Sequence, residues 1–265
     1  MFYHTLSPFL VRIYGNFGIR WYSLVYVVGF IALYYLLRYL ARKKHIKNLK
    51  VEQVDGLIVW IILGIVIGAR LFHCFGFEAS YYLSNPIACL QIWKGGLAFH
   101  GAIIGLAAAL LIYSGKYNVK FYELADAICL FAPIMLFFGR IANFINGELY
   151  GTITNAGWCV DYSKNTHLPF VPDGCRHPSQ LYEALKNLFM FGIFFLVYKK
   201  DNKRKLFGTG FYLWLFVGLY GILRFFITFY RDEPAILGLG ISQSQHNSGI
   251  MFVIGAIMLF RLFKK

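Results

Sequence analysis

Residues 55–74 of the chain read DGLIVWIILGIVIGARLFHC. Only Asp55 and Arg70 carry a full charge in this stretch, and a helix needs about 20 mostly apolar residues to cross a bilayer. The whole chain has the same character, because 58% of its 265 residues are hydrophobic and 14% are charged. Soluble domains carry about 25% charged residues. The sequence therefore predicts an integral membrane protein that buries its apolar surface in lipid.

Similar stretches along the chain predict an all-α polytopic membrane protein with about seven transmembrane helices. We expect these spans near 20–38, 55–74, 97–113, 122–145, 180–198, 207–229 and 247–263. The first stretch has no small-residue cleavage site, and its basic cluster follows the apolar residues, so we expect a retained helix. No convincing internal repeat is present, and we expect a single transmembrane domain over residues 1–265.

The basic residues predict the orientation of these helices. Of the 26 Lys and Arg residues, sixteen lie in the connections on one side and at the C-terminus, and six lie on the other side. The richer side is cytoplasmic, so the N-terminus is expected outside and the C-terminus inside. The long connections 75–96, 146–179 and 230–246 are then outer loops. We read the net charge of +14 as a signal for orientation and lipid headgroups, and we expect no nucleic-acid partner.

Polar residues from several spans fall at the outer level of this topology. Arg70, Arg140 and Arg224 occupy the outer thirds of their helices, and a charge at bilayer depth costs about 2.5–3.5 kcal/mol. Four further residues lie at outer helix ends: Tyr22, His100, Asn143 and Glu183. Such groups face the interior of a helix bundle and commonly mark a functional site.

Residues 139–151, GRIANFINGELYG, form the densest polar segment. Arg140 and Asn143 share a helix face, and Gly147 is expected to end the helix, so that Asn146 and Glu148 turn back over the site. A guanidinium group is a rigid fork of donors that suits phosphate. The alternative is that Arg140 extends to the outer headgroups and that the asparagines cap the helix.

Two other segments have a structural and a functional interpretation. Residues 177–183, HPSQLYE, fit a helix start with Pro178 in the first turn, and Glu183 could pair with Lys186 three residues later. His100 follows the pair Gly95-Gly96 and is either a packed histidine or a site residue.

The five cysteines include no CxxC pair and no spacing typical of a zinc site, so we expect no metal. Cys159 and Cys175 share one outer loop, in an oxidising compartment, and we expect them to be bridged or close enough to bridge. Composition and spacing thus indicate an anion site that opens to the outer leaflet. A non-enzymatic lipid or anionic-solute transporter is the alternative to an enzyme, although transporters place their sites near the midplane.

Several of these motifs resemble the prolipoprotein diacylglyceryl transferase family. The segment 139–151 closely resembles the family signature, which includes Arg140, Asn143, Asn146, Glu148 and Gly151. Further similar blocks are Trp21-Tyr22, Gly68-Ala69-Arg70-Leu71, Gly95-Gly96…His100-Gly101 and the segment 177–183. The chain departs from the family at Thr228, where an acidic residue is expected four positions after Arg224. This departure brings into question an essential carboxylate on that helix.

The resemblance implies one transmembrane catalytic domain in a bacterial inner (cytoplasmic) membrane. The implied reaction moves a diacylglyceryl group from phosphatidylglycerol to the lipobox cysteine of a preprolipoprotein signal peptide, and it releases glycerol phosphate. No cofactor is implied. Arg140 and Arg224 are the expected phosphate clamp, and His100 is the expected base. The other expected substrate-binding residues are Tyr22, Arg70, Asn143, Asn146, Glu148, Gly151, Tyr182 and Glu183.

Overall fold

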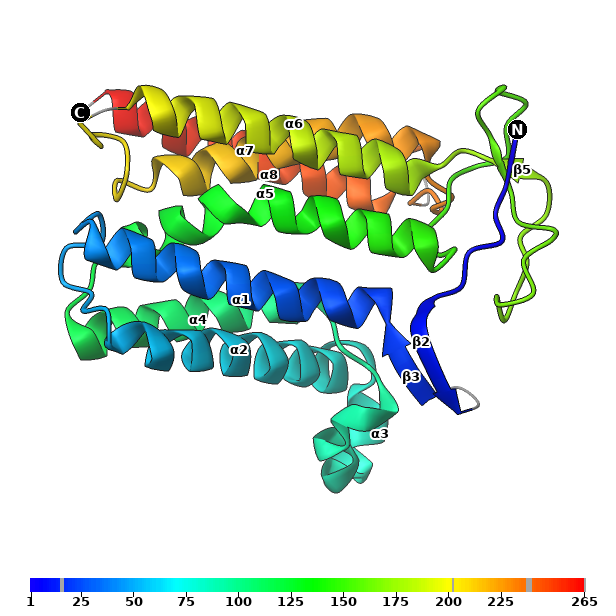
Figure 1. The fold of residues 1–265 in the computed structure, drawn as a ribbon, viewed down its shortest axis with the longest axis horizontal. Helices are drawn as coiled ribbons and strands as arrows, with labels where there is room; N and C mark the ends of the chain where they lie inside the picture. The colour runs from blue at the N-terminus through cyan, green and yellow to red at the C-terminus, as the bar shows by residue number, and fades with distance from the viewer. Residues whose placement is uncertain (15–16, 202, 237–239, 265) are drawn as a thin grey trace. The chain divides into compact units, whose positions relative to one another are not determined.

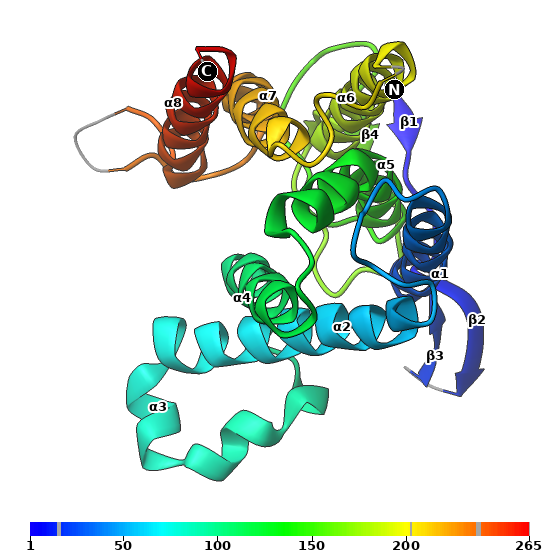
Figure 2. The same ribbon diagram turned by 90° about the vertical axis from the view of Figure 1, so that its left-hand side faces the viewer.

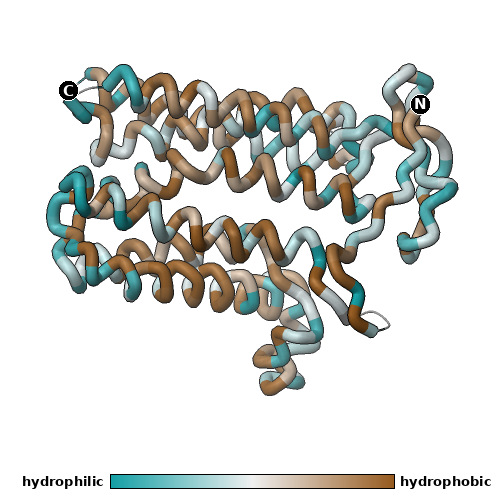
Figure 3. The backbone as a smooth tube through the Cα atoms, in the orientation of Figure 1, coloured by the Kyte–Doolittle hydropathy of each residue, from teal (hydrophilic) through white to brown (hydrophobic). Residues whose placement is uncertain are grey.

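The computed structural model describes residues 1–14, 17–201, 203–236 and 240–264. Within this part of the chain, seven helices are long and apolar enough to cross a membrane (Figure 1). Their bounds are α1 Trp21–Arg42, α2 Gln53–Phe72, α4 Phe99–Tyr117, α5 Phe121–Ile145, α6 Ser179–Lys200, α7 Phe211–Ile227 and α8 Gln243–Phe263. Hydrophobic residues run along these helices, and hydrophilic residues gather in the connections (Figure 3). The expected fold class is therefore confirmed.

The helix bounds follow the seven expected stretches, with shifts of a few residues at their ends. A π-helical turn, His73–Phe77, continues α2, and a 3-10 turn, Thr228–Tyr230, continues α7. The described residues divide into two compact units, residues 34–125 and residues 1–33 with 126–265.

Small residues hold α2 against α4 in the unit of residues 34–125 (Figure 2). A Cβ atom on Gly68 would lie 2.7 Å from Gly105 Cα, and one on Gly64 would lie 2.6 Å from Gly105 O. Gly101 faces Gly68 in the same way. Lipid offers no hydrophobic drive between helices, so close backbone approach at small residues is what brings them together. The Gly/Ala-rich composition of α4 thus has a packing role.

The connection from α2 to α4 is not the plain loop that the sequence suggested. It contains a short helix, α3 Ala79–Ser84, and two 3-10 turns, Pro86–Leu90 and Ile92–Lys94. A disulfide joins Cys74 to Cys89, with their Cα atoms 6.0 Å apart. This bridge was not predicted from the sequence.

The second unit contains α5 to α8 and most of α1, with α7 packed along α8 in both ribbon views (Figures 1 and 2). Asp126 of α5 holds the start of α7. Its carboxylate accepts hydrogen bonds from the backbone N–H groups of Gly208, Gly210 and Leu213 at 2.9–3.0 Å. The first N–H groups of a helix lack partners within the helix, so this carboxylate acts as a cap from another helix.

Strands and long connections of this unit gather at one end of its helices, which we call the loop end (Figure 1). Strands β1 Phe2–Tyr3, β4 Val160–Asp161 and β5 Cys175–Arg176 form a small sheet in the order β1-β4-β5. Strands β2 Phe9–Tyr14 and β3 Phe17–Arg20 form a hairpin that leads into α1. Cys159 and Cys175 are bridged across β4 and β5, with their Cα atoms 5.5 Å apart, as the sequence predicted. The strands themselves were not predicted.

Candidate functional site

The end of α5 carries the first part of the candidate site. Arg140 Nη1 donates to Asn143 Oδ1 at 3.4 Å, so these two residues do share a helix face. The helix ends at Ile145, and Gly147 has a φ of +67°, which reverses the chain. Glu148 then accepts hydrogen bonds at Oε1 from Asn143 Nδ2 at 2.7 Å and from Asn146 Nδ2 at 3.2 Å. The expected turn of this segment back over the helix end is thus present.

A buried carboxylate, Glu183 of α6, lies at the centre of the site. Its side chain is fully buried and pairs with three basic residues. Lys186 Nζ lies 2.8 Å from Glu183 Oε2, which confirms the expected i+3 pair. Arg140 Nε lies 3.7 Å from the same oxygen, and Arg224 Nη1 pairs with Oε1. The carboxylate therefore joins α5, α6 and α7.

A second carboxylate, Glu233, extends this network beyond the end of α7. Its Oε1 lies 3.3 Å from Arg224 Nη2 and 2.6 Å from Arg231 Nε. Burial raises the pKa of Glu233, but a hydrogen bond from Ser244 and the two arginines outweigh it and hold the pKa below its ordinary value. The carboxylate therefore stays ionised at neutral pH.

Glu233 supplies a carboxylate near Arg224, where the family resemblance leads us to expect an acidic residue at position 228 instead of Thr228. The Thr228 hydroxyl donates to the backbone oxygen of Arg224 at 2.8 Å and is buried in the helix. Besides Glu183, the carboxylate that pairs with Arg224 is that of Glu233, five residues after Thr228. Glu233 was not among the residues predicted from the sequence, although an acidic residue shortly after Arg231 was a signal that could have identified it.

The charges of this cluster do not balance. Arg140, Lys186, Arg224 and Arg231 supply four positive charges, and Glu183 and Glu233 supply two negative charges. Glu148, which is linked to Arg140 through Asn143, leaves an excess of one positive charge. A partly buried charge without a counterion is costly, so the cluster is suited to bind an anion.

The start of α6 supports the segment that follows α5. Ser179 Oγ donates to Leu149 O at 2.9 Å, and Gln180 Nε2 donates to Glu148 O at 2.7 Å. Gly151 N donates to His177 O at 2.9 Å, and a Cβ atom on Gly151 would lie 2.8 Å from the same oxygen. The segment 177–183 is therefore a helix start that also holds Glu148 in place.

Two tyrosines of the expected set lie at the edge of this network. Tyr182 Oη is 3.0 Å from His177 Nδ1 and accepts a hydrogen bond from Trp158 Nε1 at 2.8 Å. Tyr22 Oη is 3.1 Å from Tyr26 Oη, and Tyr26 lies within electrostatic range of Arg140. Neither Tyr182 nor Tyr22 has a hydrogen bond to the charged cluster among the described residues.

Arg70 and His100 belong to the unit of residues 34–125. The Arg70 guanidinium donates to backbone carbonyls, at 2.7 Å to Cys89 O and 2.5 Å to Gly95 O among others. His100 is the second residue of α4 and is exposed, with Phe72 and Phe99 as its ring neighbours. The roles expected for these two residues stay predictions.

Comparison with known proteins agrees with these motifs. The family model described as prolipoprotein diacylglyceryl transferase matches residues 8–261. A phosphatidylglycerol–prolipoprotein diacylglyceryl transferase of Neisseria gonorrhoeae is 35% identical, over 99% of this chain and 98% of its own length. Proteins with the same name from Geobacter sulfurreducens (35% identical, 96% and 94% covered) and Idiomarina loihiensis (33% identical, 98% and 95% covered) are also similar. The chain therefore belongs to the prolipoprotein diacylglyceryl transferase family of membrane transferases.

Proposed function

We propose that this protein transfers the diacylglyceryl group of phosphatidylglycerol to the lipobox cysteine of a preprolipoprotein. The observation that carries the proposal is the cluster around Glu183, in which basic side chains exceed carboxylates within a membrane helix bundle. A phosphatidylglycerol phosphodiester carries one negative charge, which matches the excess of one positive charge. The names of the similar proteins state the same lipid and the same protein substrate.

The proposed reaction is a displacement at carbon. The substrate cysteine loses its proton, its sulfur attacks the glyceryl carbon that bears the phosphate, and that C–O bond breaks. The products are a thioether on the prolipoprotein and glycerol phosphate, and the thiol proton passes to a base. The thiolate is the nucleophilic form, and a free thiol has a pKa of about 8.5, so a base near the thiol assists at neutral pH.

Charge develops on the phosphate oxygen as the C–O bond breaks, and the two arginines are suited to stabilise it. A guanidinium has five N–H donors, and in this network each arginine uses only part of its set on carboxylates or amides. Glu183 orients both groups, because it pairs with Arg140 and with Arg224. Preorganised donors of this kind stabilise a developing charge without reorganisation cost.

The remaining residues have supporting roles in this proposal. His100 is the base that accepts the thiol proton, since an imidazole is largely neutral at pH 7. Asn143 orients the lipid headgroup. The other residues proposed to contact the substrates or support the site are Tyr22, Arg70, Asn146, Glu148, Gly151, Tyr182 and Glu183.

We further propose that the loop end faces the outside of a bacterial inner membrane, where preprolipoprotein signal peptides are modified. Single cysteines introduced at Lys164 and at Lys203 test this orientation, since both positions are exposed. A membrane-impermeant thiol reagent should label position 164 in intact cells and should spare position 203 until the cells are opened. The reverse pattern would place the site on the cytoplasmic leaflet and contradict the proposal.

The function is tested with purified protein, phosphatidylglycerol vesicles and a lipobox peptide. We expect the peptide to gain the mass of a diacylglyceryl group in a thioether, with release of one glycerol phosphate per peptide. A peptide with serine in place of the cysteine is the control and should stay unmodified. Lipid movement between leaflets without any modified peptide would favour the transporter alternative.

A further inference from the structure

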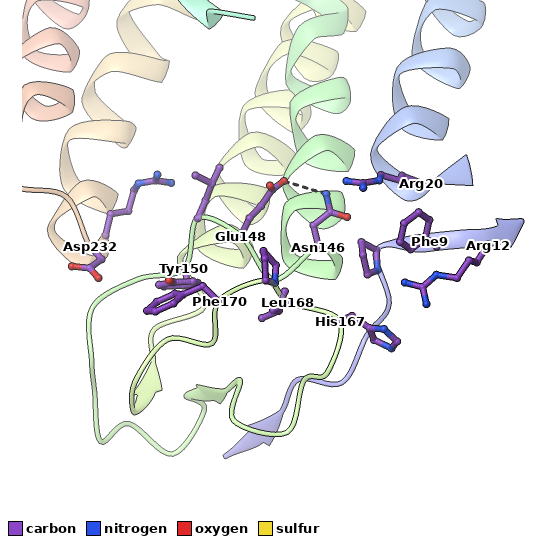
Figure 4. A pocket seen from close by; sticks show the side chains of 15 residues that line it. Phe9, Arg12, Arg20, Asn146, Glu148, Tyr150, His167, Leu168, Phe170 and Asp232 are labelled. Carbon is purple, nitrogen blue, oxygen red and sulfur yellow. Dashed lines mark hydrogen bonds between the residues drawn. The ribbon is translucent and has the colours of Figure 1, made fainter. Parts of the chain in front are cut away.

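A cavity of about 760 Å³ lies at the loop end, between the ends of the helices and the loops that follow them (Figure 4). Its walls come from the β2–β3 hairpin, from residues 146–150 and 167–170, and from residues 231–232. Pockets that hold small molecules commonly have volumes of about 300–1,000 Å³. The cavity adjoins the charged cluster, because Glu148 and Arg231 belong to both.

One part of the wall carries two guanidinium groups, those of Arg12 on β2 and Arg20 on β3. Their Cζ atoms lie 4.8 Å and 4.9 Å from the centre of the Phe9 ring. Neither guanidinium group has a hydrogen bond or ion pair among the described residues. The Arg231 side chain is 9% exposed, and its Nη1 atom is buried without a hydrogen-bond partner there. Arg12 and Arg20 therefore provide donors for a phosphate, and Arg231 adds a positive charge elsewhere in the wall.

Another part of the wall offers acceptors. Asn146 Oδ1 is buried and has no hydrogen-bond partner among the described residues, and Glu148 Oε2 lies on the same turn. Both side chains stand at the end of α5, joined by the hydrogen bond drawn in Figure 4. Asp232, the other carboxylate of the wall, is paired with Arg176 at 2.7 Å. Amide and carboxylate oxygens accept hydrogen bonds from hydroxyl groups.

We propose that this cavity is a phosphoglycerol site, in which Arg12 and Arg20 bind the phosphate and the Asn146–Glu148 turn binds the glycerol hydroxyls. The inference rests on the proposed function, which makes phosphoglycerol the polar group of the lipid and also the released product. A phosphate next to two or more hydroxyls matches a wall with guanidinium donors at one part and oxygen acceptors at another. The occupant is either the headgroup of phosphatidylglycerol before its phosphate reaches Arg140 and Arg224, or free glycerol phosphate after the transfer.

The binding test uses full-length protein in nanodiscs of uncharged lipid, without peptide. The transfer assay with phosphatidylglycerol and lipobox peptide then gives the KM of each variant for both substrates. Calorimetric titrations with glycerol phosphate, inorganic phosphate and glycerol compare the wild type with the double variant Arg12→Gln/Arg20→Gln. A second double variant, Lys164→Gln/Arg261→Gln, removes the same charge outside the cavity and serves as the control. The variant Arg12→Lys/Arg20→Lys keeps the charge and tests whether the planar donors matter. Thermal unfolding of every variant checks that the fold is retained.

We expect the wild type to bind glycerol phosphate at least about tenfold more tightly than phosphate or glycerol alone. The Arg12→Gln/Arg20→Gln variant should lose at least about tenfold in its affinity for glycerol phosphate. The Arg12→Lys/Arg20→Lys variant should lose less affinity, and the control variant should bind as tightly as the wild type. If glycerol phosphate does not bind but the KM for phosphatidylglycerol rises at least tenfold only in the cavity variants, the occupant is the lipid headgroup, which also supports the site.

Unchanged glycerol phosphate affinity and unchanged lipid KM in the cavity variants would overturn the inference. A rise confined to the KM for the lipobox peptide would also overturn it, because the cavity would then be a peptide site. The proposed function is judged separately by thioether formation in the wild type. Transfer by a wild type whose cavity variants behave normally would remove the cavity proposal and leave the transferase proposal in place.

Discussion

Arg70 and Arg224 occupy the same kind of position and yet have opposite surroundings. Each lies in the last turn of an apolar spanning helix, α2 and α7, and each is largely buried. Arg70 donates to the backbone carbonyls of the α2–α4 connection, with bonds to Ala88, Cys89, Gln91, Gly95 and Gly96. Arg224 pairs with the carboxylates of Glu183 and Glu233.

The difference shows that an arginine in a membrane-spanning helix can either fix a connection through its backbone carbonyls or pair with the carboxylates of a charged cluster. Carbonyl oxygens use up the Arg70 donors and fix a connection that the Cys74–Cys89 bridge also closes. Carboxylates instead orient Arg224 within a network that retains an excess of positive charge. We therefore expect substitutions at Arg70 to affect stability first, and substitutions around Arg224 to affect the reaction first.

The largest effect is expected from Glu183→Gln. Removal of this carboxylate leaves Arg140, Lys186 and Arg224 without their shared counterion, and loss of one partner of a buried ion pair costs about 3–5 kcal/mol. Thermal unfolding in detergent should show this loss, together with loss of transfer activity. Glu78→Gln is the control, since Glu78 is half exposed beside His73. A Glu183→Gln variant as stable as the control would remove Glu183 from the centre of the cluster.

The variants Arg140→Lys and Arg224→Lys should stay folded and lose about 10²-fold or more in turnover. An ammonium keeps the charge but cannot reproduce a bidentate grip on phosphate, and loss of one preorganised donor costs about 10²–10³ in kcat. Peptide modification by mass spectrometry measures the rate. Wild-type rates in both variants would disprove the clamp. Thr228→Ala should be mild, because within the described part of the chain its hydroxyl bonds only to the backbone of Arg224.

His100→Gln should lose at least about 10²-fold in turnover at pH 7, because general-base assistance contributes about 10²–10⁴ in rate. Activity should recover partly as the pH approaches the pKa of the thiol, about 8.5, where the substrate ionises without help. The pH profile of peptide modification is the measurement. A loss below tenfold with an unchanged profile would limit His100 to packing or positioning.

Arg70→Lys should lower stability by about 2–3 kcal/mol, since a lysine cannot reproduce the several charged hydrogen bonds of the guanidinium. Turnover at a temperature where the variant is folded should fall less than tenfold, in contrast to Arg224→Lys. Arg42→Lys, an exposed arginine in the last turn of α1, is the matched control for thermal unfolding. Normal stability with a large loss of turnover would assign Arg70 to the substrate instead.

The smallest effect concerns His4, which is buried at the loop end. Its Nε2 lies 2.7 Å from Phe144 O and its Nδ1 lies 2.6 Å from Asn165 Nδ2, so the ring is held neutral with one donor and one acceptor nitrogen. Burial, which outweighs the hydrogen bond to Phe144, lowers the pKa of His4 below 6.5. Between this lowered pKa and 6.5, the folded state then binds fewer protons than the unfolded state.

The His4 contribution to stability is therefore present above pH 6.5 and is lost as the pH falls. Thermal unfolding at pH 7.5 and at pH 5 should show a decrease for the wild type that His4→Asn reduces. His167→Asn is the control, because His167 is exposed at the same end. An equal pH dependence in wild type and His4→Asn would show that other groups cause it.

Much of the fold could be predicted because it depends on local patterns. A run of about 20 apolar residues encodes each span within its own length, and a glycine can mark a helix end, as Gly147 does. The i+3 pair of Glu183 and Lys186 is equally local. The pairing of Cys159 with Cys175 was also accessible, since both lie in one loop. The bridge between Cys74 and Cys89 was missed because Cys74 was placed inside a span.

The sequence by itself thus determined the membrane class, the seven spans, the family and the polar residues at the helix ends. Only the tertiary structure decided which partners those residues have. Arg224 meets Glu183 across 41 positions of the chain, and Arg70 meets Gly95 across 25, so no local window contains both members. Glu233 joins the charged cluster, and the arginines of the hairpin line the cavity, only in the folded chain. Helices follow from short-range periodicity, whereas ion pairs and cavities follow from contacts between segments that are distant in sequence.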